Sequence, residues 1–211
     1  MTPAVPTHFD AVVFDLLTAL LDSWTVWNRA AGSEVDGMRW RREYLRLTYG
    51  CGPYRPYEDL VREAADAVGL NQGHVDALTR RWGELQPWPE AAEILDALVR
   101  RGVRLGVATN CSVGMGRQAA DRVGVAFDAV VTAEEAGFYK PRPELYHAVL
   151  GRLGADPART LFVAGSPADV PGATGAGMPV FWHNRAGLPP IADGASPLLV
   201  ADTLHPLLDL L

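Results

Sequence analysis

The sequence predicts an α/β protein in which a parallel sheet carries helices on both faces and an all-helical insert interrupts the alternation. Three observations support this fold class. A short apolar run, residues 11–14, lies near the N-terminus, and further apolar runs alternate with helix-length segments from about residue 89 onward. The interval 23–83 between these parts has several helical patterns and no convincing strand. Alternation of strands and helices is typical of a parallel sheet covered on both faces.

Five apolar runs are predicted to be strands, and each of them ends at a polar residue or at glycine. The runs and the residues that follow them are 11–14 before Asp15, 103–108 before Thr109 and Asn110, 129–131 before Thr132, 161–164 before Gly165 and Ser166, and 180–182 before His183. In an open parallel sheet, ligands bind beyond the carboxyl ends of the strands. We therefore expect the functional site at this edge of the sheet.

The interval 23–83 is predicted to be helical because its apolar residues recur at helical spacing. One such stripe consists of Leu60, Val61, Ala64, Ala65 and Val68. Trp88 lies between two prolines, which predicts a stiff, non-helical return to the sheet. We therefore expect two domains: a core made of residues 1–15 and 86–211, and a helical cap made of residues 16–85 with its connections.

The composition limits the classes of function. Of 211 residues, 48% are hydrophobic, which is enough for a substantial core. The chain has 19 Lys and Arg against 25 Asp and Glu, and its net charge of −6 has the wrong sign for binding nucleic acid or anionic lipid. No stretch approaches the roughly 18 apolar residues of a membrane span, and the first residues do not resemble a signal sequence. We expect a cytoplasmic protein with no nucleic-acid or membrane partner.

Six polar residues are predicted to meet at the carboxyl edge of the sheet. They are Asp15, Thr109, Asn110, Lys140, Ser166 and Asp169. Lys140 is the only lysine in a chain that otherwise uses arginine, and a compact ammonium binds differently from a planar guanidinium. A carboxylate that a lysine holds ionised can act as a nucleophile. The alternative interpretation is a buried ion pair surrounded by residues that cap strand ends.

Four segments resemble motifs of the haloacid dehalogenase superfamily. They are FDLLTALLD at 14–22, GVATN at 106–110, YKPRPELY at 139–146 and VAGSPADVPGATGAGMP at 163–179. The resemblance covers nearly the whole chain. It implies a Rossmann-like core with an inserted helical cap, and it implies that Asp15 is the nucleophile.

Within this superfamily, the chain resembles the L-2-haloacid dehalogenases more closely than the phosphatases. The phosphatases carry a second aspartate two residues after the nucleophile, where it protonates the leaving group and helps bind Mg²⁺, and here that position is Leu17. A halide leaving group needs no proton. Two separated acids beside a lysine are also a poor site for a divalent cation. We therefore expect neither a metal nor another cofactor.

The resemblance to the dehalogenases implies five catalytic residues, which are Asp15, Lys140, Asp169, Thr109 and Asn110. Asp15 attacks the halogenated carbon and forms an ester. Lys140 orients Asp15 and keeps its carboxylate ionised. Thr109 helps hold the substrate or the nucleophile, and Asp169 positions Lys140 or activates the water that hydrolyses the ester.

The same resemblance implies which residues bind the substrate and the departing halide. Asn110 and Arg41 stabilise the halide, and a Trp-Arg pair begins a cap helix in this branch, as Trp40 and Arg41 do here. A tyrosine six residues after the lysine is also typical of the branch. Besides the catalytic Asn110, the residues expected to bind substrate or halide are Arg41, Tyr146, Ser166, Leu17 and Trp40.

We therefore predict a hydrolase that cleaves the carbon–halogen bond of short 2-haloacids through an ester on Asp15. The chain departs from the branch at Thr18-Ala19, where Gly-Thr is usual, and at residues 164–166, where Ser-Ser-Asn is usual. Three alternatives stay open: a hydrolase displacing another leaving group at carbon, a Mg²⁺-dependent phosphatase, and a non-catalytic binding protein. The expected partner is a small halogenated carboxylic acid, and a homodimer is compatible with the resemblance.

Overall fold

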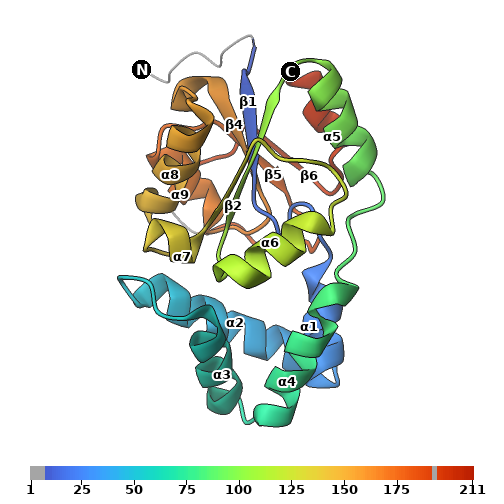
Figure 1. Cartoon of the computed structure of the whole chain (residues 1–211), viewed down its shortest axis with the longest axis vertical. Coiled ribbons are helices and arrows are strands. Elements are labelled where there is room, and N and C mark those ends of the chain that lie inside the picture. The colour runs from blue at the N-terminus through green and yellow to red at the C-terminus, as the bar shows by residue number, and fades with distance from the viewer. Residues whose placement is uncertain (1–7, 192–193) are drawn as a thin grey trace.

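The sheet has six parallel strands in the order β3-β2-β1-β4-β5-β6 (Figure 1). This computed structural model describes residues 8–191 and 194–211. The strands are β1 (Ala11–Phe14), β2 (Arg104–Thr109), β3 (Ala129–Thr132), β4 (Thr160–Ala164), β5 (Val180–His183) and β6 (Leu199–Ala201). The predicted fold class is confirmed. Strand β6 was not predicted, because it has only three residues and Val200 is exposed, so no continuous apolar run marks it.

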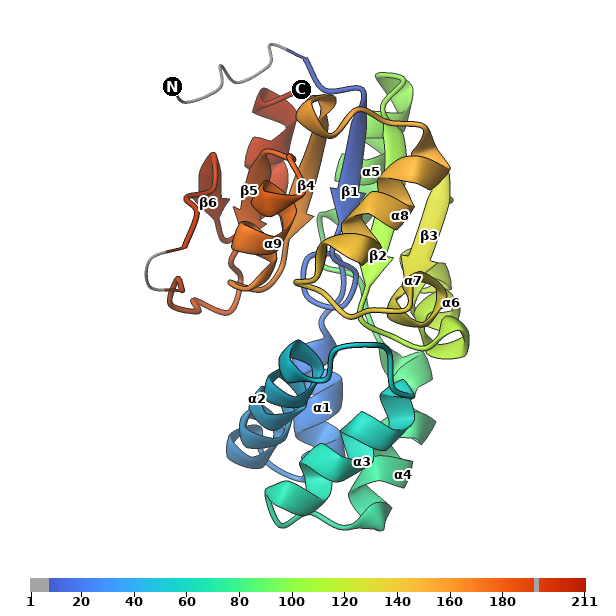
Figure 2. The same cartoon turned by 90° about the vertical axis from the view of Figure 1, so that its left-hand side faces the viewer.

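Helices cover both faces of the sheet (Figures 1 and 2). Helices α5 (Ala91–Arg100) and α6 (Val113–Asp121) pack on one face, and α8 (Pro143–Leu153) and α9 (Asp169–Gly175) pack on the other. The short elements are α7 (Ala133–Ala136), η2 (Pro157–Arg159) and η3 (His205–Asp209). Right-handed crossovers require this division, since the chain moves from β1 toward β3 and then back across to β4 and β5.

The residues between β1 and α5 form four helices with a common aromatic core. These are α1 (Ser23–Ala31), α2 (Glu34–Gly50), α3 (Tyr57–Ala67) and α4 (Gln72–Arg81), followed by η1 (Trp82–Glu84). Trp27 packs edge-on against Trp40 with ring centroids 4.9 Å apart, and Tyr44 and Tyr57 continue the cluster. In Figure 2 these helices lie together below the sheet. Among the described residues, no helix is long and apolar enough to cross a membrane.

The two connections to the helical segment run side by side. Leu21 and Pro87 form an antiparallel bridge, and the amide of Trp88 donates to the carbonyl of Leu20 over 2.9 Å. The Trp88 indole also donates to the carbonyl of Thr18 over 3.0 Å. The helical segment therefore leaves and rejoins the sheet at one place, directly beside the turn that follows β1.

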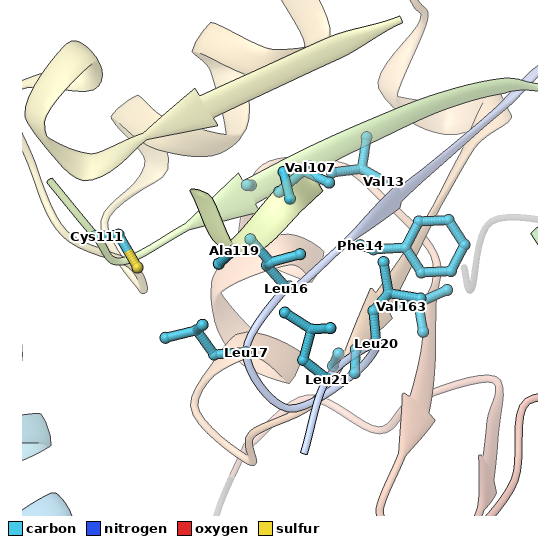
Figure 3. Packing of buried hydrophobic residues seen from close by; sticks show 14 of the residues in the cluster. Val13, Phe14, Leu16, Leu17, Leu20, Leu21, Val107, Cys111, Ala119 and Val163 are labelled. Atoms are coloured by element: carbon cyan, nitrogen blue, oxygen red, sulfur yellow. The ribbon is translucent and has the colours of Figure 1, made fainter. Parts of the chain in front are cut away.

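That turn is anchored in the hydrophobic core. Strand β1 is fully buried, and Leu16, Leu20 and Leu21 from the turn belong to the same buried cluster as Phe14 and Val163 (Figure 3). Close packing of this kind leaves side chains few alternative positions. The first residue after β1 is therefore held in a rigid setting.

Candidate active site

Asp15 is the first residue after β1, at the point where the order of the strands reverses. The chain moves from β1 to β2 on one side, whereas β4 and β5 lie on the other side. Open α/β sheets bind their ligands at such a point. The Asp15 amide donates to the Val163 carbonyl of β4 over 2.9 Å, and the residue is only 7% exposed.

The two carboxylate oxygens of Asp15 have different partners. Oδ2 accepts three hydrogen bonds, from the Thr18 hydroxyl at 2.6 Å, the Thr18 amide at 3.0 Å and the Ala19 amide at 3.2 Å. Oδ1 accepts one, from Lys140 Nζ at 2.7 Å. Since a carboxylate oxygen has about two lone-pair directions, Oδ2 is saturated and Oδ1 can accept a further contact.

Lys140 is buried between two carboxylates. Its Nζ lies 2.7 Å from Asp15 Oδ1 and 3.1 Å from Asp169 Oδ1. Burial lowers the pKa of the ammonium, but the charges of both aspartates outweigh burial and raise the pKa above its ordinary value. Asn110 holds the backbone of this residue, because its side chain accepts from the Lys140 amide at 2.7 Å and donates to the Lys140 carbonyl at 3.1 Å.

Asp169, at the start of α9, completes a buried network with Lys140. Its carboxylate accepts from the Tyr146 hydroxyl at 3.2 Å and from the Ser166 hydroxyl at 3.1 Å. Burial and the nearby charge of Asp15 raise the pKa of Asp169, although Lys140 lowers it. For Asp15, burial also raises the pKa, but Lys140 and the hydrogen bonds from Thr18 hold it below its usual value. The environment thus shifts the pKa values of the two aspartates in opposite directions, downward for Asp15 and upward for Asp169.

A cavity of about 500 Å³, which we call the active-site cavity, opens beside Asp15. Arg41 of α2 lines it and is only 7% exposed. The guanidinium lies 3.9 Å from the centre of the Trp24 ring and donates to the Ser23 hydroxyl over 2.7 Å. Within the described residues, no carboxylate lies within 4.0 Å of Arg41. A buried cation without a carboxylate partner suits an anionic group of a ligand.

Seven of the ten predicted site residues line the active-site cavity. They are Asp15, Leu17, Arg41, Asn110, Lys140, Ser166 and Asp169. They come from the turn after β1, helix α2, the segments after β2 and β4, the loop before α8 and the start of α9. Residues that are far apart in the sequence therefore meet at the carboxyl ends of the strands, as ligand binding at this edge of the sheet predicts.

Trp40 does not line the cavity, which contradicts the expectation that it binds substrate or halide. Its side chain is fully buried against Trp27, and its indole donates to the Val61 carbonyl of α3 over 2.8 Å. Neighbouring residues on a helix point about 100° apart. Arg41 therefore faces the cavity, while Trp40 belongs to the core of the helical segment.

Thr109 and Tyr146 also lie outside the cavity lining. The Thr109 hydroxyl is buried 3.4 Å from the Cys111 sulfur and makes no hydrogen bond to Asp15. Tyr146 is fully buried, and its hydroxyl donates to the site residue Asp169. Tyr146 therefore supports a site residue and does not reach the cavity, contrary to the expectation that it binds substrate.

Thr18 and Gly165 contribute to the site, although the sequence identified them only as departures from a pattern. Thr18 supplies the hydroxyl that binds Asp15 Oδ2. A Cβ at Gly165 would lie 2.2 Å from the Thr18 hydroxyl oxygen and 2.7 Å from Asp15 Oδ2, both impossibly close. The absent side chain at Gly165 therefore makes room for the Thr18 hydroxyl. The two departures compensate for each other.

The residues around Asp15 do not fit the Mg²⁺ ion that the fold family commonly binds. Leu17 stands where a second acid would be needed, and Lys140 occupies the space between Asp15 and Asp169. Across residues 8–191 and 194–211, no group of three or more His, Cys, Asp or Glu side chains is placed to hold a metal. A hard divalent cation needs several oxygen ligands at once.

Comparisons with known proteins find both dehalogenases and a phosphatase among the similar proteins. The chain is 29% identical over 195 residues to haloacetate dehalogenase H-2 of Moraxella sp. (strain B), covering 84% of this chain and 87% of the relative. It is 30% identical over 180 residues to a phosphoserine phosphatase of Thermus thermophilus, covering 81% and 72%. A crystal structure of an L-2-haloacid dehalogenase matches with a TM-score of 0.85 and 28% identity, over 96% of this chain and 98% of that one.

A match to a family model shows the family to which the chain belongs. The model for haloacid dehalogenase-like hydrolases matches residues 9–177, which include β1 through α9 and every residue of the site described above. The match therefore extends over the first four strands of the sheet and the whole helical segment. The chain belongs to the haloacid dehalogenase-like hydrolases.

Proposed function

We propose that this hydrolase is a metal-independent 2-haloacid dehalogenase that acts through an ester on Asp15. One observation carries the proposal: an ionised, lysine-paired Asp15 faces a cavity lined by Arg41, a cation that pairs with no carboxylate among residues 8–191 and 194–211, and Leu17 stands where a phosphatase needs its general acid. Such a site can accept a leaving group that departs as an anion without a proton. The relatives named for haloacetate and 2-haloacids agree with it.

In the first step, Asp15 Oδ1 attacks the carbon that carries the halogen. A carbon–oxygen bond forms, the carbon–halogen bond breaks, and the electron pair leaves with the halide. Oδ1 is the attacking oxygen because Oδ2 is saturated by Thr18 and Ala19. Arg41 and the Asn110 amide, both at the cavity, stabilise the halide, and the step inverts the configuration at carbon.

In the second step, water hydrolyses the ester at the Asp15 carbonyl carbon. Asp169 in its ionised form takes a proton from the water, hydroxide adds to the carbonyl, and the bond to the 2-hydroxyacid breaks. The released alkoxide takes one proton, the second proton goes to solvent, and Asp15 returns as a carboxylate. The raised pKa of Asp169 suits a base in this step.

We also propose that residues 16–85 act as a cap over a core formed by residues 1–15 and 86–211. Trp24 and Arg41 of the helical segment line the same cavity as Lys140 and Asp169 of the core. A site divided in this way lets the cap exclude water during the first step and select the substrate.

The function is tested by halide release from L-2-chloropropionate and L-2-bromopropionate in buffer containing a chelator. We expect one halide and one D-2-hydroxyacid per substrate consumed, with no loss of rate when the chelator is present. Hydrolysis of an aryl phosphate that requires Mg²⁺ and stops with chelator would instead favour the phosphatase alternative. A lack of halide release from every 2-haloacid tested would refute the proposal.

Replacing Gly165 is expected to impair catalysis by displacing Thr18. A Cβ at this position meets the Thr18 hydroxyl, the Ala19 amide and Asp15 Oδ2 at 2.7 Å or less. Gly165→Ala should therefore lower kcat about 100-fold, since misplacement of a reacting group by about 1 Å has an effect of this size. Overpacking should also destabilise the fold by about 1–3 kcal/mol.

The matched control for that prediction is Gly151→Ala on α8, where an added Cβ meets nothing within 4 Å. Its kcat and Tm should stay at or above the values of the unmodified protein. Steady-state kinetics and thermal unfolding of both variants measure the difference. A Gly165→Ala enzyme with unchanged kcat would show that the Thr18 contact has no role in positioning Asp15.

A further inference from the structure

The active-site cavity is larger than the chemistry at Asp15 requires. Its volume is about 500 Å³, within the range of about 300–1,000 Å³ that encloses drug-sized ligands. A short acid such as 2-chloropropionate is much smaller than such a ligand. Most of the cavity would stay unfilled if a short 2-haloacid were the preferred substrate.

The rest of the cavity has mainly apolar walls. Trp24 of α1 and Met38 and Leu45 of α2 line it from the helical segment, and Leu188 and Ile191 line it from the loop after β5. None of these five side chains has a task in the bond-breaking steps described above. Burial of apolar surface is favourable roughly in proportion to its area, so these walls suit an apolar group.

The arginines that line the cavity differ in burial. Arg41 is buried near Asp15, whereas Arg42 and Arg46 are exposed, and Arg46 pairs with Glu43 at 2.6 Å. Buried charge is thus confined to the end where a carboxylate and a halide would bind. The half-buried side chains Met38 and Leu45 carry no charge.

We propose that the preferred substrate is a 2-haloacid with an extended apolar substituent, such as a medium-length alkyl chain or a phenyl group. The carboxylate and halogen lie between Asp15 and Arg41, and the substituent lies along the apolar walls formed by Trp24, Met38 and Leu45. This inference rests on the proposed function, and it replaces the expectation of short 2-haloacids with a more specific substrate class.

The test is a series of 2-bromoacids of increasing length, from 2-bromopropionate through 2-bromobutyrate and 2-bromohexanoate to 2-bromooctanoate. Each buried methylene improves binding about fourfold when fully enclosed, and less in an open cavity. We therefore expect kcat/KM to rise on the order of 10- to 100-fold along the series, mainly through a lower KM. Halide release measures each rate.

A cavity-filling variant links the effect to these walls. Leu45→Trp should lower the ratio of kcat/KM for 2-bromooctanoate to that for 2-bromopropionate by about tenfold or more, because the added ring occupies the space of several methylenes. Val35→Trp is the matched control, since Val35 is 69% exposed on the same helix and lies outside the cavity lining. Its ratio should not change.

The outcomes separate the two proposals. If 2-bromopropionate is hydrolysed but kcat/KM stays equal or declines as the chain of the 2-bromoacid lengthens, the inference is overturned and the proposed function stands. An unchanged length preference in Leu45→Trp also overturns it. No halide release from any member of the series overturns the proposed function and the inference with it.

Discussion

A single turnover in water enriched in oxygen-18 is expected to place the heavy isotope in the carboxylate of Asp15 and not in the product. The proposed ester takes its bridging oxygen from Asp15 Oδ1, and the 2-hydroxyacid leaves with that oxygen. Water attacks the carbonyl carbon of Asp15, so its oxygen stays on the enzyme. Mass spectrometry of the peptide that contains Asp15, with enzyme in excess over substrate, measures the label.

The same step predicts that Asp15→Asn loses activity by about 10⁴-fold or more, as is usual when a covalent nucleophile is removed. The amide has nearly the shape of the carboxylate and can still accept from Thr18, so the fold should stay intact. Asp10→Asn is the matched control, because Asp10 is a partly exposed aspartate that pairs with Arg159 before β1. Label appearing directly in the product, or normal turnover by Asp15→Asn, would reduce Asp15 to a structural ion-pair partner.

Most of the sheet could be predicted because its strands are buried. Strand β1 is buried at all four positions and β4 at all five, and residues 11–14 and 161–164 each form an unbroken apolar run. A parallel sheet covered on both faces requires such runs. Strand β6 lies at the edge of the sheet with Val200 exposed, and its three residues carry no comparable signal.

The charged part of the site could also be predicted, because topology and charge decide it. Asp15, Asn110 and Asp169 follow strands that end at the same edge, and the chain offers only Lys140 as an ammonium to join them. The direction of a side chain depends on the local turn or helix face, which the sequence pattern does not specify. The resemblance to the dehalogenases predicts that Tyr146 contacts the substrate, whereas its hydroxyl donates to Asp169.

The contact between Thr18 and Asp15 illustrates the same limit. The threonine stands one residue earlier than the usual pattern of the dehalogenases, which predicts a displaced hydroxyl. In the folded chain the turn brings this hydroxyl to 2.6 Å from Asp15 Oδ2, and Gly165 leaves the space for it. Two positions that are far apart in the sequence have to be considered together, and a single sequence does not reveal that pair.

Replacing Lys140 with methionine should both inactivate and destabilise the enzyme. The change leaves two buried carboxylates, Asp15 and Asp169, without the ammonium that lies 2.7 and 3.1 Å from them. Removing one partner from a buried ion pair typically costs about 3–5 kcal/mol. Lys140→Arg should fail as well, since a planar guanidinium does not fit the space of a compact ammonium between these two groups.

The destabilisation of Lys140→Met should depend on pH with a definite sign. In the unmodified protein the pKa of Asp15 lies below its ordinary value of 3.8, so its contribution to stability is present above that pH and is lost as the pH falls through the lowered pKa. Asp169 has a raised pKa, so its contribution to stability is present at low pH and is lost as the pH rises through that pKa. Without the ammonium, burial raises the pKa of both carboxyl groups, so the folded variant binds more protons than the unfolded chain.

The deficit in stability relative to the unmodified protein should therefore be small near pH 5 and larger near pH 8, where both carboxyl groups are forced to ionise without a partner. Thermal unfolding of both proteins across this range measures it. Arg62→Met is the control, because its exposed pair with Asp59 should contribute little to stability. A deficit that grows toward acid pH, or none at all, would mean that Lys140 does not hold the two buried charges together.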